Sequence, residues 1–188
     1  MLSLQSHARV PPATPRRARQ IQAALVLTVA AAAVGCPVRV IPLRAERPPL
    51  PAAGQALEVI PSLAGAADPM PVRFTDIAFG DVAVTTARLI AAAAAPWAAR
   101  HARERPGGWQ MLLEIVRSDA EVREGRLTVE IEARVTVRAT AGQMHIGQTR
   151  GYCRQSDDLG GGDGSPVVNR CLERMSRDLA GWLEGLNP

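Results

Sequence analysis

Residues 127–138, LTVEIEARVTVR, decide the fold of this chain. Apolar residues alternate strictly with polar or charged ones, and this period of two indicates a strand that buries one face and exposes the other. Such alternation is typical of an antiparallel sheet that is covered on one side. We therefore expect one dry face, packed against other elements, and one wet face in contact with solvent.

The segments around this strand predict the other strands of the sheet. Residues 109–115 alternate in the same way, and a turn at Ala141-Gly142 leads into a third strand over 144–153. Residues 72–78 are apolar enough for a further strand. The polar, glycine-rich stretch 155–164 is expected to be a loop.

Two helices are predicted between and after these strands. Asp81 is a suitable N-cap for the first helix, which Pro96 should kink or restart. Ser165-Pro166 begins the second with an N-cap followed by a proline at the first helical position. Apolar residues of the second helix repeat at helical spacing and should face the sheet: Val168, Leu172, Met175, Leu179, Trp182, Leu183 and Leu186.

This order of elements predicts an α+β fold, β-α-β-β-β-α. We expect a small antiparallel sheet of three to four strands with two helices packed on one face. The folded domain should span residues 71–188, which is long enough for a single core.

The first 36 residues have the features of a secretory signal. Arginines without any acidic residue precede a short apolar run, and small residues at a cleavage site follow it: Arg9, Arg16, Arg17, Arg19, then Ala33-Val34-Gly35-Cys36. The apolar run is about a dozen residues long, whereas a membrane-spanning helix needs about 20. Ala-Val-Gly-Cys resembles the bacterial lipobox.

The lipobox resemblance implies that 1–35 is a lipoprotein signal peptide and that Cys36 becomes the lipidated first residue of the mature protein. Diacylglycerol and an N-acyl chain such as palmitate would then hold the protein stably on a membrane. Pro37 follows Cys36, so the aspartate that commonly retains lipoproteins in the inner membrane is absent. We expect an outer-membrane anchor with the domain facing the periplasm. Residues 36–70 are rich in proline and alanine and are interpreted as a tether, in which 56–60 could form a short edge strand.

The charge balance excludes a nucleic-acid footprint. The chain has 22 arginines, no lysine and 18 acidic residues, and its net charge of +4 resides in the signal segment. Because the remaining chain is balanced, we expect no nucleic-acid partner.

The cysteines fit an exported protein. With Cys36 lipidated, Cys153 and Cys171 remain, and a pair in an oxidising compartment predicts a disulfide. Two buried free thiols are the alternative. A metal site is less well supported, because two cysteines at this spacing lack a companion pair of cysteines or histidines.

Candidate chemistry is sparse. His101 and His145 have no nucleophile or metal ligand at a recognisable spacing. The aspartates of 157–163 lack the ordered oxygen ligands and the late glutamate of a calcium loop. We therefore expect no enzyme activity, no metal and no cofactor beyond the covalent lipid.

A binding surface is predicted instead on the wet face of the strand over 127–138. Its paired charges, which favour specificity and association rate, are Glu130, Glu132, Arg134 and Arg138. The alanines of 91–95 with Trp97 form either a partner groove or a seam that lets the helix lie close to the sheet.

The domain also resembles LptE, the outer-membrane lipoprotein of lipopolysaccharide transport, and the auxiliary lipoproteins of ABC-type lipid transporters. Thr149-Arg150-Gly151-Tyr152 looks like the Arg-x-Tyr of that group, and Met175, Asp178-Leu179 and Leu183 look like its last helix. The resemblance implies an accessory or assembly component of an outer-membrane or lipid transport system that binds an envelope protein. The alternative is a lipoprotein that binds a small apolar ligand in a pocket between sheet and helices, beneath Trp97, Trp109 or Trp182.

Overall fold

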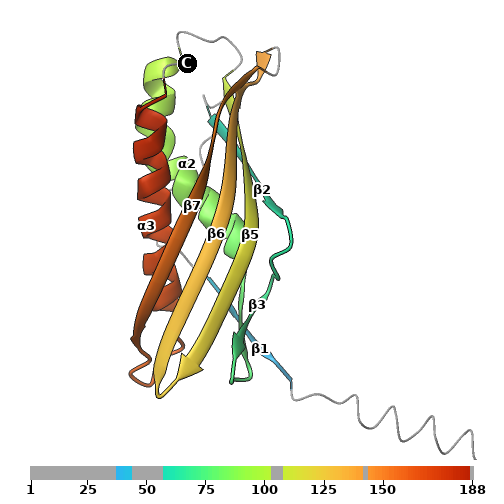
Figure 1. Cartoon of the computed structure of the whole chain (residues 1–188), viewed down its shortest axis with the longest axis vertical. Helices are drawn as coiled ribbons and strands as arrows, with labels where there is room; N and C mark the ends of the chain where they lie inside the picture. Colours follow the sequence, from blue (N-terminus) through green and yellow to red (C-terminus); the bar gives the residue numbers. More distant parts are fainter. Residues whose placement is uncertain (1–36, 44–56, 103–107, 142–143, 187–188) are drawn as a thin grey trace, which may run out of the picture. The chain divides into compact units, whose positions relative to one another are not determined.

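The computed structural model describes residues 37–43, 57–102, 108–141 and 144–186. Cys36 and the predicted signal peptide lie outside the described residues. The elements follow in the order β1 (Arg39–Pro42), β2 (Leu57–Leu63), β3 (Met70–Arg73), β4 (Ile77–Gly80), α2 (Val82–His101), β5 (Trp109–Arg123), β6 (Arg126–Ala139), β7 (His145–Asp158) and α3 (Ser165–Glu184). Both helices lie on the same face of a mixed sheet (Figure 1).

Three long antiparallel strands form the centre of the sheet, as the alternation predicts. β6 pairs with β5 on one side and β7 on the other, with Leu113 opposite Val135 and Ile131 opposite Cys153. Every second residue of β6 is fully buried beneath the helices, and the residues between them reach the other face. One hydrophobic core therefore fills the space between this sheet and the two helices.

The expected sheet of three to four antiparallel strands is wrong, because the sheet has seven strands and mixed directions. β2 and β3 both run parallel to β5 and pair with different parts of it, Leu57 opposite Trp109 and Val72 opposite Ala120. β4 is antiparallel to β3, and β1 adds a parallel edge strand. The 15 residues of β5 offer an edge long enough for two short strands in tandem, and α2 supplies the long crossover that parallel pairing needs.

The strand expected over 72–78 is divided by a turn. β3 ends at Arg73, which lies opposite Glu121 of β5, and β4 begins only at Ile77. Phe74 lies between them with a φ of 68°, a left-handed conformation that bulky residues rarely adopt. β1, β2 and Met70, the first residue of β3, belong to the range 36–70 that we interpreted as a tether.

α2 is continuous through Pro96, so the helix does not restart there. Pro96 lies on the exposed side of the helix, and α2 runs on to His101. The helix is long and apolar enough to cross a membrane by length and composition, but about 56% of its most apolar window is buried within the fold. We interpret it as a core helix.

α3 begins one residue from the expected position. Gly164 occupies the N-cap, and the backbone N–H of Ser165 donates to Asp163 Oδ1 at 2.9 Å. The proline after Ser165 lies in the first turn, where its missing N–H costs little.

Candidate functional site

The candidate site is the outer face of β5, β6 and β7, the face opposite the helices. Its side chains come from the polar positions of the alternating strands. A β-bulge at 115–117 inserts one extra residue in β5, so that even-numbered residues face outward before it and odd-numbered residues after it. The bulge brings Arg117 opposite Glu132 and Asp119 opposite Glu130.

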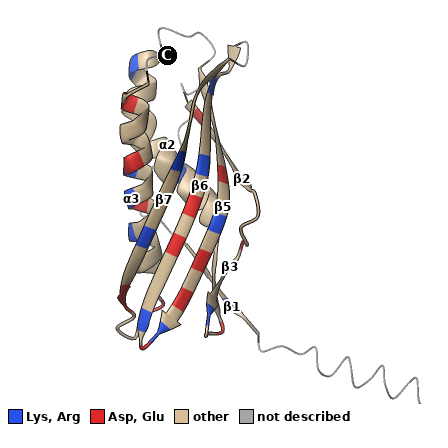
Figure 2. Cartoon of the chain, in the orientation of Figure 1, with Lys and Arg blue, Asp and Glu red and all other residues tan. Residues whose placement is uncertain are grey.

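Acidic and basic residues lie near one another on β5, β6 and β7 (Figure 2), and ion pairs join neighbouring strands across this face. Glu114 on β5 accepts from Arg134 on β6 at 3.4 Å, and Glu132 accepts from Arg150 on β7 at 3.3 Å. Single exposed pairs of this kind contribute little stability. The ion pairs instead define where positive and negative charges lie on the outer face.

Arg117 is the best-anchored cation of the face. Its Nε donates to Asp119 Oδ2 at 2.6 Å, and its guanidinium lies 3.3 Å from Glu130. The hydrogen bond to Asp119, and then the charges of Glu130 and Asp119, raise the pKa of Arg117 above its ordinary value. The neighbouring carboxylates thus favour the charged guanidinium, which an arginine keeps at physiological pH in any case.

All four predicted surface residues lie on this outer face. Glu130, Glu132 and Arg134 take part in the ion pairs. Arg138 lies further along β6, opposite Gln110 and His145, and makes no ion pair among the described residues. The structure thus places three of the four in separate ion pairs with β5 or β7 and leaves Arg138 outside these pairs.

The most exposed part of the face belongs to β7, and sequence reasoning did not assign it to the binding surface, since Arg150 and Tyr152 were noted only for their resemblance to LptE. Gln148, Arg150, Tyr152, Arg154 and Ser156 point outward in turn, since the residues between them face the helices. The Arg150 side chain is 74% exposed and Tyr152 is 52% exposed. The period-two pattern of 148–156 was a signal for this row, but the small residues between the polar ones weakened it. β7 is also the last strand of the sheet.

A shallow groove lies elsewhere, between α2 and α3. It has a volume of about 420 Å³ and is lined by Leu89, Ala92, Ala93, Glu173, Ser176 and Arg177. Ser176 donates to the carbonyl of Leu172 at 2.8 Å, so its hydroxyl is satisfied within the helix. The alanines expected to form a seam thus lie partly at this groove and partly in the core, where Ala91 and Ala94 are buried.

The space beneath Trp97 is filled by side chains. Trp97 and Trp109 are each 1% exposed, and their rings pack 5.3 Å apart. His101 lies beside them, 5.1 Å from the Trp97 ring. Trp97 and Trp109 therefore belong to the packed core, and the pocket for a small apolar ligand stays a prediction.

The remaining polar residues singled out in the sequence have structural roles. Asp157 pairs with Arg170 and Asp158 with Arg126, so these aspartates join β7 to its neighbours. In the described part of the chain, no three residues of the types His, Cys, Asp and Glu gather as metal ligands would.

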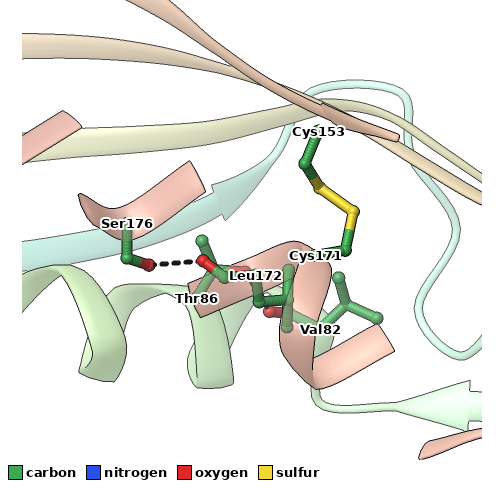
Figure 3. The surroundings of a disulfide bond; sticks show 6 residues. All are labelled: Val82, Thr86, Cys153, Cys171, Leu172 and Ser176. Atoms are coloured by element: carbon green, nitrogen blue, oxygen red, sulfur yellow. Dashed lines mark hydrogen bonds between the residues drawn. A yellow bond between two sulfur atoms is a disulfide. The ribbon is translucent and has the colours of Figure 1, made fainter. Parts of the chain in front are cut away.

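The predicted disulfide is present. Cys153 on β7 bonds to Cys171 in α3, with their Cα atoms 5.5 Å apart (Figure 3). Both cysteines are buried on the helix side of the sheet. The bond therefore joins the start of α3 to the strand that carries the exposed row.

No family model and no curated protein matches the sequence. Among solved structures, a candidate lipoprotein from Caulobacter crescentus CB15 is 14% identical and has a TM-score of 0.44, covering 69% of this chain and 92% of its own. Protein XCC0632 from Xanthomonas campestris, of family DUF330, is 12% identical with a TM-score of 0.48, covering 77% and 94%. CT253 from Chlamydia trachomatis is 14% identical with a TM-score of 0.39, covering 70% and 96%. We draw nothing about function from likenesses of this size, and they do not show the resemblance to LptE, which stays a prediction.

Proposed function

We propose that this protein is a lipid-anchored envelope protein that acts by binding a protein partner and has no catalytic activity. Its partner would belong to an outer-membrane or lipid transport system, in which the protein is an accessory or assembly component. The lipobox ending at Cys36 supports the anchor. The observation that carries the binding role is the exposed row Arg150, Tyr152 and Arg154 on the outer face.

The composition of this row suits a protein interface. Tyrosine and arginine are the residue types that most often dominate binding energy, because each combines a large contact area with directed hydrogen bonds. Tyr152 lies opposite Glu132, between the two arginines of its own strand. Arg154 makes no ion pair among the described residues, so its charge is available to a partner.

The rigidity of the face supports the same role. β7, the strand that carries the row, pairs with β6 over nearly the whole length of β7, and the disulfide joins β7 to α3. A surface that is already ordered loses little conformational entropy on binding. The surrounding charge pairs would then favour one partner and one orientation over others.

The test is capture of an envelope partner by the full lipidated protein, purified from detergent-solubilised membranes after cross-linking. We expect Tyr152→Ala and Arg154→Glu each to weaken capture about tenfold or more, as substitutions at dominant interface residues do. Arg174→Glu reverses a charge of the same kind on the exposed surface of α3 and serves as the matched control. All three variants should unfold within about 1 kcal/mol of the parent protein, because they change surface residues.

Undiminished capture by both outer-face variants would exclude the row as the binding surface. Ala92→Arg then provides the second arm, since it places a long charged side chain in the groove between α2 and α3. Loss of capture in that variant alone would assign the partner to the groove.

A further inference from the structure

Three parts of the chain meet at one end of the sheet, here named the β1 end. They are the start of β1, the turn between β3 and β4, and the hairpin between β5 and β6 (Figure 1). The backbone N–H of Arg39 donates to the carbonyl of Asp76 at 2.7 Å, which joins β1 to the turn. The guanidinium of Arg123 lies 5.7 Å from the centre of the Phe74 ring, which joins the turn to the hairpin.

The β1 end exposes large apolar side chains. Phe74 is 75% exposed, the highest value for a large hydrophobic residue in the described part of the chain. Val38, which directly precedes β1, is 57% exposed, and Val40 on β1 is 51% exposed. These three are among the four most exposed large hydrophobic residues described, so the exposure is concentrated and not scattered.

Phe74 is held outward at a conformational cost. Its φ of 68° places a bulky residue in the left-handed region, where such residues are outliers. The fold accepts this strain without burying the ring. Strain of this kind is concentrated at functional positions, which favours a role for the exposed ring in binding.

The short length of chain between Cys36 and β1 indicates that a bilayer lies next to this end. Cys36 and Arg39 are three residues apart, so their Cα atoms can be separated by at most about 11 Å at full extension. The polar headgroup layer adds only about 5–8 Å to each side of the hydrocarbon core. A lipid-anchored Cys36 therefore leaves the start of β1 no room to stand far from the bilayer surface.

The charges of the β1 end are balanced. The basic and acidic residues there are equal in number, and Asp119 pairs with both Arg73 and Arg117. They are Arg39, Arg73, Arg117, Arg123 and Arg126 against Asp76, Asp119, Glu121, Glu124 and Asp158. Contact with a membrane here would depend on its apolar side chains, and much less on attraction to anionic lipid.

We propose that the β1 end lies directly on the bilayer that holds the anchor, with the Phe74 ring inserted at the interface and Arg123 at the level of the phosphates. The proposal rests on the lipid anchor of the proposed function and adds a second, non-covalent contact. It fixes the orientation of the sheet on the membrane. Aromatic rings with a polar neighbour suit the membrane interface, where one side is apolar and the other wet.

The test uses the mature lipidated protein reconstituted in phosphatidylethanolamine–phosphatidylglycerol vesicles whose acyl chains are brominated. Phe74→Trp keeps an aromatic ring at the same backbone position, and Tyr152→Trp is the matched control on the outer face. We expect bromine to quench the added emission of Trp at position 74 and to leave the added emission at position 152 unchanged. The quenching of emission at position 74 should be equally strong in brominated vesicles of phosphatidylcholine alone, because the charges of the β1 end are balanced.

The mass of the Cys36 peptide from the same preparation shows whether Cys36 is lipidated. It therefore distinguishes failure of the lipid anchor from failure of the docking of the β1 end. A lipidated Cys36 with no quenching at position 74 overturns the docking and leaves the anchor standing. An unmodified Cys36 overturns both. Cross-linking of position 74 to a co-purifying protein, with no quenching, would assign the β1 end to a protein contact and also overturn the docking.

Discussion

At the scale of single residues, the disulfide is the clearest link between sequence and structure. Cys153 lies opposite Ile131 on the buried side of β7, and Cys171 lies near the start of α3. The bond closes a loop that contains the glycine-rich connection between them. That connection has few apolar contacts of its own, so a cross-link limits its freedom in the unfolded chain.

Replacing both cysteines with serine should lower the free energy of unfolding by about 3 kcal/mol, the chain-entropy value for a loop of this length. Urea unfolding followed by circular dichroism measures the change. Reductant should destabilise the parent protein and have no effect on the double variant. Equal stability of the two proteins would mean that the bond contributes nothing to folding.

Two glycines in β7 set how closely α3 approaches the sheet. A β-carbon added at Gly151 would lie 3.0 Å from Met175 Cγ and 3.1 Å from Leu179 Cδ1. At Gly147 it would lie 3.0 Å from Leu186 Cδ2 and 3.2 Å from Trp182 Cζ2. Both glycines face the helix side of the sheet. At the scale of elements, α3 can therefore pack this closely against β7 only because these two positions carry no side chain.

Gly151→Val should therefore destabilise the protein by about 1–3 kcal/mol, because the branched side chain overpacks the contact between β7 and α3. Gly181→Ala is the matched control on α3, since nothing lies within 4 Å of its added β-carbon. That control should stabilise the helix by up to about 1 kcal/mol. Thermal and urea unfolding of the two variants would contradict this account if both shifted in the same direction.

At the scale of the whole molecule, the proposed anchor and the sheet would act together. β1 begins three residues after Cys36, so a lipidated Cys36 would also determine which surface the domain meets. Pro37, the residue after the anchor, is then expected to decide which membrane that is.

Pro37→Asp should move the lipidated protein from outer-membrane to inner-membrane fractions, because an aspartate after the lipidated cysteine favours retention in the inner membrane. Separation of membranes on a sucrose gradient, followed by immunoblotting, measures the distribution. Cys36→Ser is the unanchored control and should leave the membrane fractions. An unchanged distribution of the aspartate variant would argue against sorting by this position.

Local patterns in the sequence were enough to predict the central strands and the two helices, whereas the disulfide was predicted from the compartment that the signal segment implies. The alternation over 127–138 predicted β6 and its two faces, and helical spacing predicted α3. Each of these signals is complete within a short segment, since a period of two or of 3.6 needs no distant partner. The outward positions of Glu130, Glu132 and Arg134 followed from the same pattern.

Tertiary structure alone decided how large the sheet is and which surfaces it presents. β1 and β2 are short strands in a proline-rich region, and they are stable only because β4 and β5 offer them free edges. The bulge in β5 exchanges the faces of its two halves, and the turn at Phe74 splits β3 from β4. Pairing between strands depends on residues far apart in the chain, so a periodic pattern can show that a segment is a strand but not which strand it joins.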